Sequence, residues 1–309
     1  MVAISEVKSA NASLAKSPQE LTAVFTGATN GIGLATLRAF AKHISSPRAI
    51  IIGRSQTNFA HELDNLHSIN PNGNYTFLEA EISLIPNIDQ ICQTIQTVLD
   101  GRKIDLLIMS QGYISFTGRE TNADGLDTSI SLRYYGRMRF AQNLLPSMSE
   151  HARVLSILAG GQEGKIIEDD LDLERYYSIP ASMAQFASMT TLSFDHLARE
   201  DPKKSFIHVF PGLTSTGLLG RSATGVLGLL MRWVVEPVLG LFAATSEEVG
   251  ERVLYYATSG LYKARGECWP LNEKGEPTVG DALKGYREGA WAEKVWEHDQ
   301  RMFERALSK

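Results

Sequence analysis

The stretch from Leu21 to Phe40 decides the fold of this sequence. It opens with Ala23-Val24-Phe25, a short apolar run that predicts a buried strand. The run stops at a glycine-rich turn, Thr26-Gly27-Ala28-Thr29-Asn30-Gly31-Ile32-Gly33, and apolar residues then recur at helical spacing. A strand, a glycine-rich turn and a helix form a phosphate site, because the first N–H groups of a helix are unpaired and its dipole favours an anion. The stretch therefore predicts dinucleotide binding.

Each glycine of this turn has a physical purpose. Gly27 permits the tight turn, Gly31 lets the backbone approach a pyrophosphate, and Gly33 lets the helix pack close to the sheet. Their spacing, Thr-Gly-x-x-x-Gly-x-Gly, resembles that of the short-chain dehydrogenase/reductase family. The resemblance covers roughly residues 20 to 260, and it implies an α/β fold: a Rossmann-type doubly wound parallel sheet with helices on both faces and a small helical C-terminal lid.

The bulk composition narrows the class of protein. With 309 residues and 43% hydrophobic residues, the chain can form one large globular domain. A net charge of −5 and the absence of a basic stripe argue against a nucleic-acid partner. The two cysteines, Cys92 and Cys268, fit no metal-binding spacing, so no metal is expected. The first seventeen residues lack the apolar core of a secretion signal, which favours a cytoplasmic protein.

The end of the second predicted strand indicates which dinucleotide is bound. Residues 48 to 53 form a continuous apolar run that ends in Gly53-Arg54-Ser55. In a nucleotide-binding fold this strand end faces the adenosine ribose, where a carboxylate accepts from a 2′-hydroxyl and an arginine accommodates a 2′-phosphate. Arg54 and Ser55 offer a guanidinium and a hydroxyl, and there is no acid. NADP(H) is therefore favoured over NAD.

The family resemblance places the remaining cofactor residues at other strand ends. A strand at 104–109 leads into Ser110-Gln111-Gly112, where the family usually has Asn-Asn-Ala-Gly. A strand at 205–210 leads into Pro-Gly-x-x-x-Thr, whose backbone and threonine hold the nicotinamide carboxamide in the family. The predicted cofactor-binding residues are Thr26, Gly27, Asn30, Gly31, Ile32, Gly33, Arg54, Ser55, Glu81, Ile82, Ser110, Gln111, Gly112, Pro211, Gly212, Leu213, Thr214 and Thr216.

The catalytic residues of the family are replaced in this chain. Met183 falls at the place of the proton-donating tyrosine, Ala187 at that of its lysine, and Arg133 at that of the asparagine. Leu158 and Ala159 stand where the serine is expected. The sequence therefore lacks the ordinary carbonyl-reduction machinery. It predicts either loss of chemistry or a hydride transfer in which no carbonyl oxygen needs a proton, as in reduction of an iminium.

Short segments around 133–140, 158–164 and 169–173 resemble a fungal secondary-metabolism branch of the family, the bifunctional reductase/Diels–Alderases of prenylated indole alkaloid pathways. Those enzymes use an arginine and an aspartate near NADP(H) to reduce an iminium or zwitterion and guide a [4+2] closure to a bicyclo[2.2.2]diazaoctane. Carried over by position, Arg133 is the arginine and Asp169 the preferred acid, with Asp170 and Glu168 as the alternatives in the same loop. The implied substrate is an apolar small molecule, a prenylated indole alkaloid precursor.

The chain divides into an N-terminal arm at 1–18 and one NADP-binding domain at 19–309. An apolar segment at 217–245 is expected to form a substrate lid, in which Leu229, Trp233 and Val238 fold the prenyl arm of the substrate. A peripheral membrane contact or a dimer face is the competing reading; charged residues make the segment too interrupted for a transmembrane span. Residues 262–309 are expected to be a C-terminal extension. Relatives use the last two core helices as dimer faces, which leaves a homo-oligomer open.

Two other functions compete with the reductive cyclase. The first is an ordinary NADPH-dependent ketone reductase that uses Tyr177 as its proton donor. The second is an NADP(H)-binding protein without hydride transfer. Turnover of NADPH with an imine separates the enzymes from the inert binder.

Overall fold

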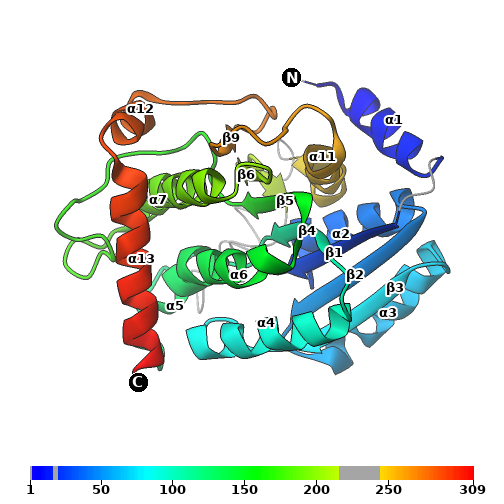
Figure 1. Cartoon of the computed structure of the whole chain (residues 1–309), viewed down its shortest axis with the longest axis horizontal. Helices are drawn as coiled ribbons and strands as arrows, with labels where there is room; N and C mark the ends of the chain where they lie inside the picture. The colour runs from blue at the N-terminus through cyan, green and yellow to red at the C-terminus, as the bar shows by residue number, and fades with distance from the viewer. Residues whose placement is uncertain (1, 17–19, 216–243) are drawn as a thin grey trace.

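The computed structural model describes residues 2–16, 20–215 and 244–309. Within them, one parallel sheet of seven strands has the order β3-β2-β1-β4-β5-β6-β9 (Figure 1). The strand bounds are β1 Glu20–Thr26, β2 Ser46–Gly53, β3 Asn74–Glu79, β4 Ile104–Met109, β5 Met148–Ile157, β6 Ser205–Val209 and β9 Trp269–Leu271. The order reverses direction between β1 and β4, and ligands of such sheets bind in the crevice at the carboxyl ends of these strands.

Helices cover both faces of the sheet (Figure 1). One hydrophobic cluster joins the sheet to α2 (Gly31–His43), α3 (Gln56–Ile69) and α11 (Ser246–Thr258). The other joins it to α4 (Ile85–Leu99), α6 (Gly136–Leu144) and α7 (Ile179–Glu200). Alternate strand residues point to opposite faces, so Phe25 belongs to the first cluster and the neighbouring Val24 to the second. The doubly wound fold is therefore confirmed.

The segment before β5 is not one regular helix. A short α5 (Thr128–Ile130) leads into a π-helical turn, Ser131–Tyr135, before α6 begins. The Asp127 side chain starts the segment by accepting a hydrogen bond from the backbone N–H of Ile130 at 2.8 Å. A 3₁₀ turn, Leu145–Ser147, ends it. We refer to Ser131–Tyr135 as the π-turn.

The two ends of the chain pack against the core. The predicted arm contains a helix, α1 (Ile4–Leu14), that lies against α11. Its buried Asn11 donates hydrogen bonds to the backbone oxygen and a carboxylate oxygen of Glu251, at 2.8 and 2.7 Å. The segment predicted as an extension contributes β9 to the sheet, followed by α12 (Asp281–Glu288) and α13 (Trp291–Leu307). It is therefore an integral part of the domain.

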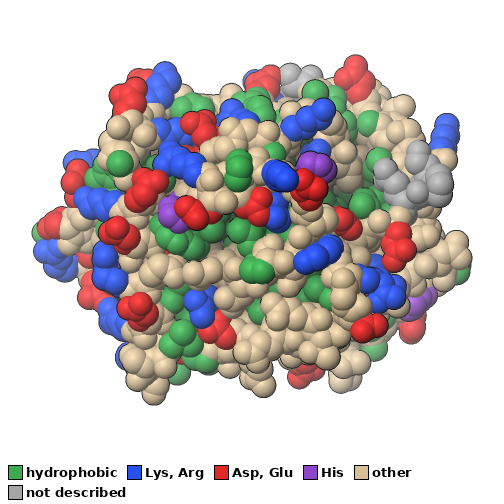
Figure 2. Space-filling model, in the orientation of Figure 1, with side chains coloured by type: hydrophobic (Ala, Val, Ile, Leu, Met, Phe, Trp, Pro, Cys, Tyr) green, Lys and Arg blue, Asp and Glu red, His purple; other side chains and the backbone are tan. Residues whose placement is uncertain are grey.

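The predicted lid falls mainly outside the described residues, together with Leu229, Trp233 and Val238. Its flanks pair as two short parallel strands, β7 (Thr214–Ser215) and β8 (Ala244–Thr245). Among the described helices, none is both long and apolar enough to cross a membrane. Figure 2 shows acidic and basic side chains interspersed over the face turned to the viewer.

Candidate active site

The glycine-rich turn forms a tightly packed cradle at the start of α2. Gly27 has a φ of 78°, and a Cβ atom on it would lie 2.3 Å from the backbone nitrogen of Gln111. A Cβ atom on Gly33 would lie 2.3 Å from Ser110 Oγ and 2.6 Å from the Gly27 carbonyl oxygen. The Asn30 side chain accepts from the Gly31 N–H at 2.6 Å. Only glycine fits these positions, so the turn suits a backbone site for a pyrophosphate.

The groups predicted to meet the adenosine lie at the same edge of the sheet. Arg54 is exposed directly after β2, and its guanidinium has no hydrogen bond or ion pair with another described residue. Ser55 caps α3, and its hydroxyl accepts from the Asn58 N–H at 3.3 Å. Glu81 accepts from the Ser83 N–H at 3.0 Å, and Ile82 between them is buried. Arg54 is therefore available to a 2′-phosphate.

The end of β4 links the cofactor cradle to the predicted catalytic arginine. Gln111 is buried, and its side-chain oxygen accepts from Thr26 Oγ1 at 2.6 Å, whereas its amide nitrogen has no partner within the described structure. Ser110 Oγ donates to the carbonyl oxygens of Thr26 and Gly27. A Cβ atom on Gly112 would lie 2.7 Å from Arg133 Cγ. The unpartnered Gln111 amide fits a site that a ligand completes.

The segment after β6 was predicted to hold the nicotinamide. Gly212 has a φ of 72°, and the Thr214 hydroxyl donates to the carbonyl oxygens of Pro211 and Gly212, both at 3.3 Å. Leu213 is 63% exposed. Thr216 lies outside the described residues. The nicotinamide role of this turn stays a prediction.

Arg133, on the π-turn, is a buried cation held by hydroxyl groups. Its Nη2 donates to Ser182 Oγ at 2.7 Å and its Nε to Ser129 Oγ at 3.2 Å. The side chain has no carboxylate partner among the described residues, and its Nη1 makes no hydrogen bond with any of them. Burial lowers the pKa of Arg133, and nearby Tyr177 and Asp127 oppose that shift. A buried guanidinium with a spare donor can bind a substrate oxygen.

Arg137 and Arg139 have other surroundings. Arg137 is 1% exposed and joins the ends of β4 and β5: it donates to the carbonyl oxygens of Gln111 and Ile157 and to Ser156 Oγ. Burial, with a smaller contribution from Arg133, lowers the pKa of Arg137 to about 9. Arg139 instead forms a two-pronged ion pair with Asp89, with both N–O distances at 2.6 Å. The three arginines thus have three different roles.

The acids of the predicted catalytic loop are engaged elsewhere. The Asp169 side chain is 70% exposed and pairs with Arg175 at 2.9 Å, and Glu168 lies 3.6 Å from Lys294. Asp170 is buried, and its carboxylate accepts from three backbone N–H groups at 2.8–3.0 Å, those of Glu174, Arg175 and Tyr176. None of the three acids hydrogen bonds to Arg133. The structure brings Arg133 together with Ser182, Ser129 and Tyr177 instead.

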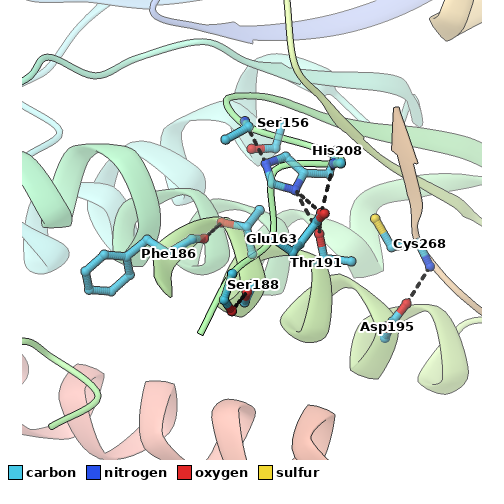
Figure 3. A network of polar contacts seen from close by, with 12 residues as sticks. Ser156, Glu163, Phe186, Ser188, Thr191, Asp195, His208 and Cys268 are labelled. Atoms are coloured by element: carbon cyan, nitrogen blue, oxygen red, sulfur yellow. Dashed lines mark hydrogen bonds and ion pairs between the residues drawn. The ribbon is translucent and has the colours of Figure 1, made fainter. Parts of the chain in front are cut away.

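A buried network, which the sequence did not reveal, supports the end of β5 (Figure 3). His208 Nε2 accepts from the backbone N–H of Ala159 at 3.0 Å, and its Nδ1 lies 2.9 Å from Thr191 Oγ1. The Thr191 hydroxyl donates to Glu163 at 2.6 Å. Burial lowers the pKa of His208, so the ring is neutral and its Nδ1–H donates to Thr191. The network fixes the backbone where the family usually carries its serine.

Known proteins with similar sequences identify the family to which this chain belongs. Residues 21–168 match the family described as short chain dehydrogenase. "Oxidoreductase AN1596" of Emericella nidulans is 36% identical, and the match covers 100% of both chains. The chain belongs to the short chain dehydrogenase family. It is thus an oxidoreductase of a family that uses a nicotinamide cofactor.

Other relatives of this short chain dehydrogenase bear similar names. "NmrA-like family domain-containing oxidoreductase notO" of an Aspergillus species is 38% identical over 88% of this chain and 80% of its own. Among solved structures, the angucycline C-6 ketoreductase LanV with bound NADP has a TM-score of 0.60 at 17% identity, over 86% of this chain and 99% of that one. The latter likeness concerns the fold alone.

Proposed function

We propose that this short chain dehydrogenase reduces a bulky apolar precursor of a fungal secondary metabolite with NADPH, and that Arg133 binds an oxygen atom of that precursor. The observation that carries the proposal is the state of Arg133: 7% exposed, fixed by two serine hydroxyls, and without a carboxylate partner among the described residues. A buried cation of this kind is costly unless a ligand or a developing negative charge uses it.

The cofactor cradle supports NADPH as the reductant. The turn from Thr26 to Gly33 would hold the pyrophosphate, Arg54 the 2′-phosphate, and the backbone from Pro211 to Thr214 the carboxamide. When bound, NADPH supplies the hydride. The unpartnered amide of Gln111 and the glycine cradle both fit such a ligand.

Exposed apolar side chains support an apolar substrate. Tyr176, Met183 and Leu213 are 55%, 45% and 63% exposed. Each lies next to a residue already placed in the site, because Met183 follows Ser182, Tyr176 precedes Tyr177, and Leu213 follows the Pro-Gly turn. The prediction of an apolar lid over 217–245 is in keeping with the same class of substrate.

In its most specific form, the proposal is reduction of an iminium or zwitterionic prenylated indole precursor followed by a guided [4+2] closure. Arg133 would hold the substrate oxygen, and an acid of the 168–170 run would stabilise the cation. Asp169 and Glu168 are the better choices, because each gives up only an exposed ion pair, and such pairs contribute little. To act on the substrate, the Asp170 carboxylate would have to break its hydrogen bonds with three backbone N–H groups. Orientation within a shaped pocket can supply several kcal/mol of the closure barrier.

A second function, reduction of a ketone, is favoured by the position of Tyr177. Burial raises the pKa of this phenol, and the Arg133 charge lowers it. In the ordinary enzymes of the family a lysine has that effect on the catalytic tyrosine. Arg133 and Tyr177 would then share the task, with Tyr177 donating a proton to the new alkoxide.

Turnover measurements on two probes test these forms. NADPH oxidation would be followed with 3,4-dihydro-β-carboline, a cyclic indole imine, and with 1-indanone, an apolar ketone. The reductase proposal expects turnover of one probe, and a large loss of that turnover in Arg133→Ala. Loss of imine turnover in Asp169→Ala supports the iminium form, and loss of ketone turnover in Tyr177→Phe supports the ketone form. NADPH binding without any turnover would favour the inert binder.

A further inference from the structure

We infer that the C-terminal helix α13 positions the catalytic arginine, through His298 and Asp299, which hold the two tyrosines that follow Arg133 on the π-turn. The inference rests on the proposed role of Arg133 and adds residues that lie far from it in the sequence. Tyr134 and Tyr135 are the positioning residues on the π-turn, and His298 and Asp299 are their partners on α13.

The first contact is a buried cluster of three polar side chains. The Tyr134 hydroxyl donates to Asp299 Oδ2 at 2.7 Å, and Ser193 Oγ, on α7, donates to the same oxygen at 2.8 Å. Tyr134, Ser193 and Asp299 are all fully buried. Burial raises the pKa of Asp299 to about 8. Two hydroxyl donors thus converge on one buried carboxyl oxygen of α13.

The second contact lies one residue later on the π-turn and one residue earlier on α13. The Tyr135 hydroxyl is 2.9 Å from His298 Nε2, and the two rings are 6.1 Å apart between centroids. Burial lowers the pKa of His298 to about 4, so the ring is neutral and its Nε2 can accept from the phenol. Consecutive residues of α13 therefore hold consecutive residues of the π-turn.

The π-turn explains why such support matters for Arg133. π-helical turns are rare and occur frequently at functional sites. The turn has other anchors, since Ser131 Oγ donates to the carbonyl oxygen of Ser83 at 2.6 Å. That anchor lies on its first residue, whereas Ser129 and Ser182 hold the Arg133 side chain and the two tyrosines hold the end of the turn. Because residues 133–135 share one short backbone, a shift of either tyrosine moves the guanidinium relative to the strand ends.

A purely structural role is the competing explanation. α13 also buries apolar side chains such as Val295, Met302 and Phe303, so it would pack against the core without any effect on the site. The two explanations differ in one respect. A positioning role acts through Arg133, whereas a structural role is independent of it.

Hydrogen exchange provides the first test and needs no substrate. Tyr134→Phe and Tyr135→Phe would be compared with Glu293→Gln, which breaks the exposed ion pair of α13 with Arg199, at 2.8 Å, and leaves the π-turn alone. We expect backbone exchange over 128–140 to accelerate about tenfold in the tyrosine variants and to stay unchanged in the control. Unchanged exchange in both tyrosine variants would overturn the inference.

A double-mutant cycle provides the second test, with whichever of the two probes the enzyme reduces. We expect Tyr134→Phe to lower kcat about tenfold with the Kd for NADPH unchanged, and to have no further effect in the Arg133→Ala background. Tyr135→Phe serves in its place if Tyr134→Phe fails to fold. An equal loss of kcat in the wild-type and Arg133→Ala backgrounds would contradict this inference and leave the proposed function unaffected. If Arg133→Ala leaves kcat unchanged, the proposed function is contradicted, and the inference is contradicted as well because it rests on the role of Arg133.

Discussion

The cradle at the start of α2 and the π-turn before α6 both face the carboxyl edge of the sheet, yet they are built from different parts of the chain. In the cradle, close packing around Gly27 and Gly33 presents backbone N–H groups. In the π-turn, a long side chain, Arg133, is presented, and hydroxyl groups from two other segments hold it. The first construction thus presents backbone groups, whereas the second presents one side chain whose position depends on its own hydrogen bonds.

The difference between the cradle and the π-turn indicates which substitutions should impair function most. A site made of backbone tolerates truncation of most side chains, because its donors remain in place. A site made of one side chain loses its function when that side chain is removed. The predictions below test this difference, beginning with the largest effect.

Arg133→Ala should lower kcat/KM for the reduced probe by about 10²–10³-fold, the loss typical for removal of one donor to a developing charge. Steady-state kinetics with saturating NADPH would measure it. Arg139→Ala is the matched control, because that side chain on the neighbouring α6 pairs with Asp89 away from the strand ends. A loss below about threefold in Arg133→Ala would show that the π-turn is not a catalytic element.

Arg137→Ala should lower the free energy of unfolding by about 3 kcal/mol, since the carbonyl groups of Gln111 and Ile157 would remain buried without a donor. Urea denaturation of the cofactor-free protein would measure this value. Arg139→Ala, which removes a partly exposed pair, should lower it by about 1 kcal/mol or less. Equal losses would contradict the distinct environments of the two arginines.

Arg54→Ala should weaken NADPH binding about tenfold and leave NADH binding unchanged, because only NADPH carries the 2′-phosphate. Titration calorimetry with both dinucleotides would measure the ratio. Arg48→Ala, toward the opposite end of the same strand, is the control. If NADH binding weakened by the same factor, Arg54 would not be reading the 2′-phosphate.

The smallest effect concerns the far end of α2, where His43 and Asn11 both contact Glu251. Burial alone would raise the pKa of Glu251, but these hydrogen bonds outweigh it and hold the pKa below its usual value. Glu251 therefore stabilises the fold above its unfolded pKa of about 4.3, and this contribution is lost as the pH falls through the lower folded pKa. The protection factors of the α1 amides, which correct for the intrinsic pH dependence of exchange, should fall in that acidic range, and Glu251→Gln should remove this fall.

The fold was predictable because its signals are local. The strand at 104–109 was expected with the bounds that β4 has, and Gly27 and Gly33 marked the cradle. The catalytic half was harder, because helical spacing of apolar residues over 126–145 looks the same with or without a π-turn. Asp170 was an alternative for the catalytic acid, and its partners in the structure are the backbone N–H groups of Glu174, Arg175 and Tyr176. The Tyr134–Asp299 contact joins residues 165 positions apart, and no local pattern announces it.

The place of α13 near the end of the chain also affects how the enzyme is made. During synthesis, the cradle and the first five strands can emerge and fold well before residues 291–307 leave the ribosome. The partners of Tyr134 and Tyr135 emerge after every strand of the sheet. The nascent enzyme would therefore acquire its dinucleotide site early and its ordered arginine late, so that a chain stalled before α13 could retain cofactor without being able to use it.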